Sequence, residues 1–152
     1  MSSKVILDFI EGIEQDEAIN LKTFMLLCDN KILAQFSKEP YSIEDQQLLF
    51  SMTKSFASLG VGIAADKGCL DIEDKIISYF TNKLPEQISD NLREVKVKHL
   101  LTMTSGIHDN TYEMLYPQKD WVKAFLAQNF PHEPGTYYRY STHGSHILSA
   151  LI

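Results

Sequence analysis

A serine and a lysine three residues apart, Ser51 and Lys54, are the residues of this sequence whose types and spacing could do chemistry. If the chain is helical from Ser51 onward, a separation of three turns it by about 300°, so both side chains leave one face of the helix. A serine hydroxyl becomes a good nucleophile when a neighbouring base takes its proton, and a lysine can be that base if burial or a nearby cation lowers its pKa. We expect the apolar neighbours Phe50, Met52 and Phe56 to supply such surroundings.

The spacing by itself is weak support, because a Ser-x-x-Lys match is expected by chance about once in a chain of this length. The alternative is purely structural. In that interpretation Ser51 is the N-cap of a helix and Lys54 is a solvated residue of its first turn. The rest of the sequence has to decide between the two.

Composition and charge narrow the classes of protein. The 152 residues are 44% hydrophobic, enough for a core, and the net charge of -6 argues against nucleic acid or a membrane as partner. The first residues contain no apolar run of signal-peptide length, which predicts a cytoplasmic protein. Cys28 and Cys69 are then expected to be reduced thiols. His143 and His146 have no cysteine or acid beside them, so neither a metal nor a cofactor is expected.

The beginning of the chain predicts a helix followed by a hairpin. Apolar residues at helical spacing behind Ser2 and Ser3 predict an amphipathic helix from residue 3 to about 15, within a leading segment of residues 1–20. Two β-capable runs flank Asp29 and Asn30, which predicts a hairpin over residues 21–38. Because a lone hairpin with one helix is marginal in water, we expect a wider sheet.

Residues 39–152 are predicted to be mostly helical. A helix from Ser51 should end near Gly68, and its many small residues predict close packing in the middle of the domain. Further helices are predicted behind Asp71, over residues 95–103, around Trp121 and over residues 146–152. Along the helix from Ser51, one face is expected to carry an apolar stripe that consists of Met52, Phe56, Leu59 and Ile63.

Five stretches, in order, resemble the penicillin-recognising serine hydrolases: class C β-lactamases, DD-carboxypeptidases and transpeptidases, β-lactamase-like esterases and 6-aminohexanoate-oligomer hydrolases. They are FMLLCDNKILAQF at 24–36, FSMTKSF at 50–56, LDIEDKI at 70–76, HLLTMTSGI at 99–107 and PGTYYRYSTHGSHIL at 134–148. The fourth is similar to the signature HLLTHTSGL, with Met103 where a histidine is common. The fifth is similar to PGxxFxYSNxGYxLL. The resemblance covers residues 22–152.

The resemblance implies an α+β fold of the β-lactamase and transpeptidase type and assigns roles to three residues. Ser51 would be the nucleophile, Lys54 the group that helps to deprotonate it, and Tyr140 a second acid/base group. An ester, amide or peptide carbonyl would acylate Ser51, and water would release the product. A nearby Lys54 would favour the anion of Tyr140, whose ordinary pKa is about 10. The implied partner is a small-molecule or short peptide substrate.

Two departures from the family pattern affect what we expect. Thr142 stands where the family often has an asparagine, so substrate choice should change, and Thr142 is a candidate substrate-binding residue. The aromatic residues Tyr112, Tyr116 and Trp121 could line a substrate cleft or simply pack. A Lys-Thr-Gly or His-x-Gly strand motif has no counterpart before Ile152. The resemblance therefore implies that residues 1–152 are the mostly helical N-terminal portion of such a domain, without its C-terminal strands.

Such a portion is expected to have little or no hydrolase activity alone, because the absent strand would supply an oxyanion-hole donor. One alternative is a non-catalytic binding or regulatory module on the same scaffold. Another is self-association or assembly with the missing half, through an unpaired hairpin edge. The substrate stays open among β-lactams, esters, D-amino peptides and aminohexanoate oligomers.

Overall fold

The computed structural model describes residues 2–108 and 112–152, except the side chains of residues 112 and 113. The chain forms two compact units, divided between residues 48 and 49. Within the described residues, no helix combines the length and apolar character needed to cross a membrane.

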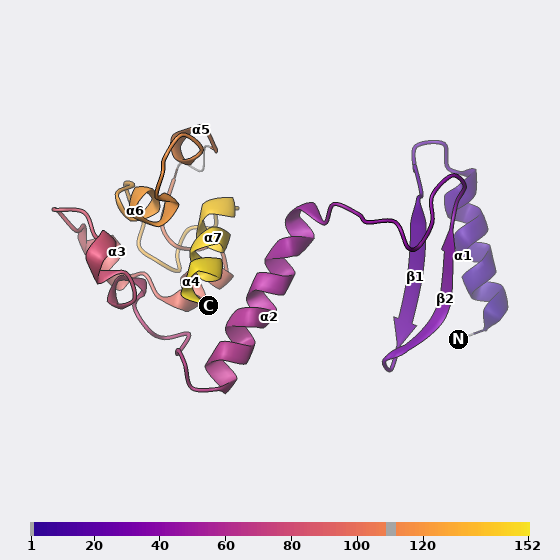
Figure 1. Ribbon diagram of the computed structural model, residues 1–152, viewed down its shortest axis with the longest axis horizontal. Coiled ribbons are helices and arrows are strands. Elements are labelled where there is room, and N and C mark those ends of the chain that lie inside the picture. The colour runs from indigo at the N-terminus through magenta and orange to yellow at the C-terminus, as the bar shows by residue number, and fades with distance from the viewer. Residues whose placement is uncertain (1, 109–111) are drawn as a thin grey trace. The chain divides into compact units, whose positions relative to one another are not determined.

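The first unit is a helix beside a two-stranded hairpin (Figure 1). Helix α1 (Ser3–Gln15) begins behind Ser2, whose side chain accepts a hydrogen bond from the Lys4 N–H. Strands β1 (Thr23–Cys28) and β2 (Lys31–Ser37) pair antiparallel. Asp29 and Asn30 join them with φ of 48° and 59°, the left-handed values that a tight two-residue turn requires. The predicted helix and hairpin are therefore confirmed.

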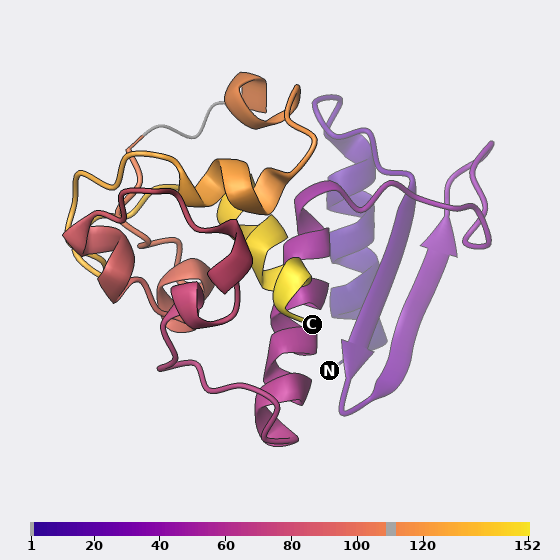
Figure 2. The ribbon, with the colours of Figure 1, turned by 60° about the vertical axis from the view of Figure 1, so that its left-hand side comes forward.

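The second unit is helical and holds the hydrophobic core. Its largest fully buried side chains include Phe125, Phe130 and Ile147. Helix α7 contacts α2, α4 and α6, and Figure 2 shows it, in yellow, beside α2. The elements are a 3₁₀ turn (Phe50–Met52), α2 (Thr53–Asp66), two more 3₁₀ turns (Ile76–Ser78 and Thr81–Lys83), α3 (Asp90–Glu94), α4 (Val97–Leu101), α5 (Tyr112–Leu115), α6 (Trp121–Leu126) and α7 (Thr142–Leu151).

Helix α2 exists as predicted, but its apolar stripe is not the face that is buried. The four residues of the predicted apolar stripe, Met52, Phe56, Leu59 and Ile63, are each more than half exposed. The buried residue of α2 is Val61. The reason is that α7 packs closely against α2 at Gly60, next to Val61. A Cβ added at Gly60 would lie only 2.6 Å from a side-chain atom of Ile152, so the missing side chain of this glycine makes the contact possible.

The helix predicted behind Asp71 is also wrong. The Asp71 carboxylate accepts the Glu73 N–H locally, and the chain then turns to pair with residues 95–97. The Ile76 N–H donates to the Val95 carbonyl at 2.9 Å, which leaves only a 3₁₀ turn at Ile76–Ser78. Because a backbone partner lies across from this segment, its N–H groups have no need of a helix.

The other helices follow their sequence signals with shorter or shifted bounds. The helices predicted over residues 95–103 and around Trp121 are confirmed as α4 and α6. The last helix begins at Thr142, earlier than predicted, because the Ser141 side chain caps it by accepting the Gly144 N–H at 2.9 Å. Helices α3 and α5 were not predicted.

Candidate active site

Ser51 and Lys54 lie one turn apart where the 3₁₀ turn leads into α2. The Lys54 ammonium donates a hydrogen bond to the Ser51 Oγ at 3.1 Å. The N-cap of α2 is Met52, so the interpretation of Ser51 as the helix cap does not hold. Phe50, directly before the serine, has φ of 45°, a left-handed conformation that bulky residues rarely adopt and that recurs at functional sites.

Tyr140 reaches the same hydroxyl from 89 residues away along the chain. Its phenol donates to the Ser51 Oγ at 2.5 Å, and the Lys54 Nζ lies 4.9 Å from the centre of its ring. The hydrogen bond with Ser51 and then the nearby Lys54 ammonium lower the pKa of Tyr140 below its ordinary value. Both partners can donate to a phenolate, so an amine and a phenol converge on one serine hydroxyl.

The predicted apolar surroundings of Lys54 are wrong. The side chains of Phe50, Met52 and Phe56 are between 57% and 81% exposed. They therefore do not enclose the ammonium in a low-dielectric environment. The pKa of Tyr140 is therefore lowered by its hydrogen bond with Ser51 and by the nearby Lys54 ammonium, and not by burial.

Three backbone hydrogen bonds hold the segment that delivers Tyr140. The His132 N–H donates to the Gly106 carbonyl, the Gly135 N–H to that of Thr104, and the Arg139 N–H to that of Met103. Gly106 has φ of 90°, and a Cβ built there would lie 2.2 Å from the His132 carbonyl oxygen. Only glycine fits this crossing, which joins the two sequence signatures at 99–107 and 134–148.

A hollow of about 280 Å³ opens beside Lys54, between α2, α6 and α7. Thr142 and Trp121, two of the predicted cleft residues, line it. The side chain of Tyr112, the other predicted substrate-binding residue, lies outside the described residues, and Tyr116 is 72% exposed. The residues that line the hollow are Phe50, Thr53, Lys54, Ala57, Trp121, Thr142, Ser145, His146 and Ser149.

Sequence reasoning missed the hydroxyl-rich wall that α7 contributes to this hollow. Thr142, Ser145, His146 and Ser149 recur at three- and four-residue spacing, which places polar side chains on one face of a helix. This three- and four-residue spacing of polar residues is visible in the sequence and could have predicted a polar face on the last helix. Across residues 2–108 and 112–152, no three His, Cys, Asp or Glu side chains gather in a way that could hold a metal ion.

A serine hydroxyl between an amine and a phenol, at the head of a helix, is an arrangement suited to acyl transfer. Residues 29–152 match the model of the Beta-lactamase family, and the chain belongs to that family. The predicted membership of the penicillin-recognising serine hydrolases is thereby confirmed. A search of curated protein sequences finds no match.

Solved structures show the same fold. A proposed β-lactamase from Bacteroides dorei is 15% identical, with a TM-score of 0.75 over 99% of this chain and 45% of its own. A proposed 6-aminohexanoate-dimer hydrolase from Bacillus anthracis is 13% identical, with a TM-score of 0.68 over 99% and 42%. A class C β-lactamase is 21% identical, with a TM-score of 0.72 over 97% and 42%.

These comparisons confirm the predicted β-lactamase-like α+β fold. The chain spans less than half the length of each of the three solved structures. The assignment of residues 1–152 to the N-terminal portion of one hydrolase domain stays a prediction, as do the catalytic roles of Ser51, Lys54 and Tyr140.

Proposed function

We propose that Ser51 is the nucleophile of a serine hydrolase that acts on an ester, amide or peptide carbonyl through an acyl-enzyme. The observation that carries the proposal is the convergence of the Tyr140 phenol and the Lys54 ammonium on the Ser51 Oγ, at 2.5 and 3.1 Å. Membership of the Beta-lactamase family supports it, and so does the likeness to structures described as a β-lactamase and as a 6-aminohexanoate-dimer hydrolase.

Tyr140, as its phenolate, is the base of the proposed mechanism. It takes the proton of the Ser51 hydroxyl while Oγ attacks the carbonyl carbon, and Lys54 keeps the phenolate charge balanced. The tetrahedral intermediate collapses, and the leaving alcohol or amine takes the proton from Tyr140. Water then gives a proton to the phenolate as it attacks the acyl carbon. The bond between that carbon and the Ser51 Oγ breaks, and Tyr140 returns the proton to Oγ, which releases the acid and restores both Ser51 and the phenolate.

The rate of the 152-residue chain is expected to be low. The described residues form one sheet of two strands, whereas the family's oxyanion hole draws one of its two N–H donors from a later strand. Removing one such donor typically slows turnover by about 10²- to 10³-fold. We therefore propose that the chain acylates slowly and turns over little unless further residues complete the sheet.

A reagent that phosphonylates reactive serines, with loss of fluoride, tests the proposal without requiring turnover. The purified chain is incubated with a fluorophosphonate probe, and the adduct is located by peptide mass spectrometry. We expect a single adduct on Ser51 that is lost in Ser51→Ala and kept in Ser55→Ala, a matched serine that is also exposed on this helix. Tyr140→Phe should slow labelling by about 10²-fold, the usual contribution of a general base.

Two results would contradict the proposal. Equal labelling of wild type and Ser51→Ala would show that the serine is not specially reactive. Equal rates in wild type and Tyr140→Phe would show that the phenol is not the base. If the chain binds ligands and Ser51 stays unlabelled, the module is a binding protein built on this scaffold.

A further inference from the structure

Two histidine rings meet beside the crossing at Gly106. The Nδ1 of His108 lies 3.4 Å from the Nε2 of His132, close enough for one ring to donate its N–H to the other. His108 is exposed and His132 is half-buried, so solvent reaches the pair. Because 24 residues separate them along the chain, no short sequence spacing predicts that they meet. Neither ring has a part in the chemistry proposed for Ser51.

The fold holds both rings in place. The His132 N–H donates to the Gly106 carbonyl at 3.2 Å, two residues before His108, so the two backbones that carry the rings are joined. The Tyr137 ring stacks on the His132 ring with centroids 4.0 Å apart, and it lies 5.9 Å from the His108 ring. A ligand that uses both histidines therefore meets them already positioned and has little side-chain entropy to remove.

The spacing of the two nitrogens suits a tetrahedral metal ion. Zinc binds imidazole nitrogen at about 2.0 to 2.1 Å, so two such ligands at the tetrahedral angle lie about 3.3 to 3.4 Å apart. Two ligands at a right angle, as in square-planar or octahedral sites, would lie only about 2.8 to 3.0 Å apart. The observed separation of 3.4 Å between His108 and His132 matches the tetrahedral value.

The protons of the pair allow this use. A neutral imidazole carries one N–H, which can sit on either ring nitrogen. The ring that donates in the metal-free pair can move its proton to its other nitrogen, so both facing nitrogens then offer lone pairs without a net loss of protons. His99 is different, because its Nδ1 accepts the Lys96 N–H at 3.1 Å, and His143 is buried.

We propose that His108 and His132 bind one zinc ion that clamps the crossing from which the chain runs to Tyr140. Within the part of the chain that the structure describes, no third histidine, cysteine or carboxylate joins the pair, so water completes the tetrahedron. The ion adds a second link to the one hydrogen bond between Gly106 and His132. Two of the four ligands of a closed site should give about half of its binding free energy, which corresponds to a dissociation constant of about 1 to 200 μM.

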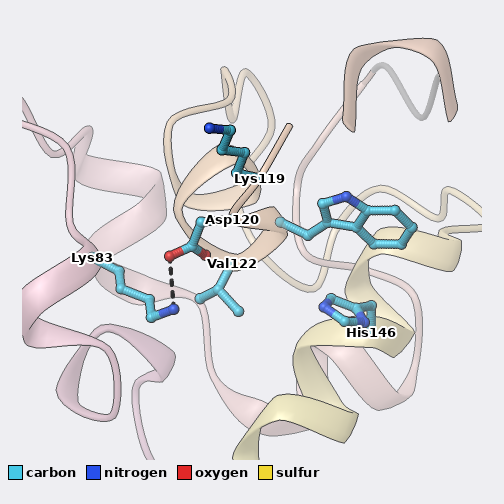
Figure 3. Close-up of a pocket in the computed structure, with 6 residues that line it drawn as sticks. Lys83, Lys119, Asp120, Val122 and His146 are labelled. Carbon is cyan, nitrogen blue, oxygen red and sulfur yellow. Dashed lines mark hydrogen bonds and ion pairs between the residues drawn. The ribbon is translucent and has the colours of Figure 1, made fainter. Parts of the chain in front are cut away.

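Nuclear magnetic resonance of the histidine rings tests the site directly. The 152-residue chain is titrated with zinc chloride, and we expect the imidazole signals of His108 and His132 to shift together and to saturate at one ion per chain. Magnesium, which prefers oxygen ligands, should leave them unchanged. His108→Gln and His132→Gln should each weaken zinc binding at least about tenfold, because each removes one of two ligands. His146→Gln is the matched control; that ring lies on α7, edge to face with Trp121 at 5.1 Å between centroids (Figure 3).

Amide hydrogen exchange tests the clamp. Saturating zinc should slow exchange of the His132 and Gly135 N–H groups in wild type and have no such effect in His108→Gln. Unshifted histidine signals in folded wild type, or zinc binding that survives both histidine substitutions, would overturn the site. Loss of binding in Cys28→Ser or Cys69→Ser would overturn it as well, because the exposed thiols would then hold the ion. Zinc binding that leaves the exchange rates unchanged would overturn the clamp.

Discussion

Substituting Gly106 by alanine tests whether the crossing of the two sequence signatures positions Tyr140. The added Cβ would lie 2.2 Å from the His132 carbonyl oxygen, about 0.8 Å inside the 3.0 Å limit that real contacts keep. The position also has φ of 90°, which costs a residue with a side chain about 1 to 3 kcal/mol. With the displaced backbone included, we expect Gly106→Ala to lower the free energy of unfolding by about 2 to 4 kcal/mol.

The same substitution should slow the chemistry of Ser51. If the backbone at His132 retreats to relieve the contact, the segment that ends at Tyr140 moves with it, through the hydrogen bonds at Gly135 and Arg139. Misplacing a reacting group by about 1 Å can slow a reaction about 10²-fold. We therefore expect fluorophosphonate labelling of Ser51 to slow by about that factor in the fraction of Gly106→Ala that remains folded.

Urea unfolding followed by circular dichroism measures the stability, and Gly62→Ala is the matched control. Gly62 lies inside α2 with nothing within 4 Å of an added Cβ, so this variant should be about 0.5 to 1 kcal/mol more stable than wild type. A Gly106→Ala variant as stable as wild type, or one that labels at the wild-type rate, would refute the reasoning about the crossing.

Two further predictions concern pH. Because the pKa of Tyr140 is lowered, its phenolate forms at lower pH than that of an ordinary tyrosine, so the labelling rate of Ser51 should rise with pH with a midpoint below about 10. Measuring the labelling rate against pH for wild type and Lys54→Met checks this. The substitution should raise the midpoint, and an unchanged midpoint would contradict the prediction. Hydrogen bonds from Lys98 and Lys96 lower the pKa of Glu73 from 4.5 to about 2, so its contribution to stability is present above pH 4.5 and is lost as pH falls toward 2. Urea midpoints should therefore fall more steeply in acid for wild type than for Glu73→Gln, and parallel curves would rule this out.

The proposed chemistry depends on hydrogen bonds and on one nearby cation more than on burial. Ser51 and Tyr140 are both exposed, and the apolar residues around the serine face outward. Charges in such surroundings are screened by water and salt, so their mutual tuning is weaker than in an enclosed site. An added element that covers Ser51 and Tyr140 would strengthen the effect of Lys54 on the phenol, and this gives a physical reason to expect low activity from the 152-residue chain.

Features set by neighbouring residues were predictable from the sequence. Asp29 and Asn30 tolerate the positive φ of the hairpin turn, and Ser2 caps α1 with its own side chain. The placement of Ser51 and Lys54 one turn apart follows from helical geometry alone. Each of these depends on contacts within about four residues, so the sequence carries the information locally.

Tertiary structure decided what depends on distant partners. The apolar stripe of α2 has the right periodicity, yet α7 packs against a different, narrower face at Gly60 and Val61. The segment behind Asp71 looks helical until residues 95–97 offer it a backbone partner. The family resemblance pointed to Tyr140, but its contact with the Ser51 hydroxyl exists only in the folded chain. Three backbone hydrogen bonds between residues 103–106 and 132–139 hold the segment that carries Tyr140, and no local sequence pattern predicts them. Periodicity describes the faces that a helix offers, and the surrounding packing selects the face that is buried.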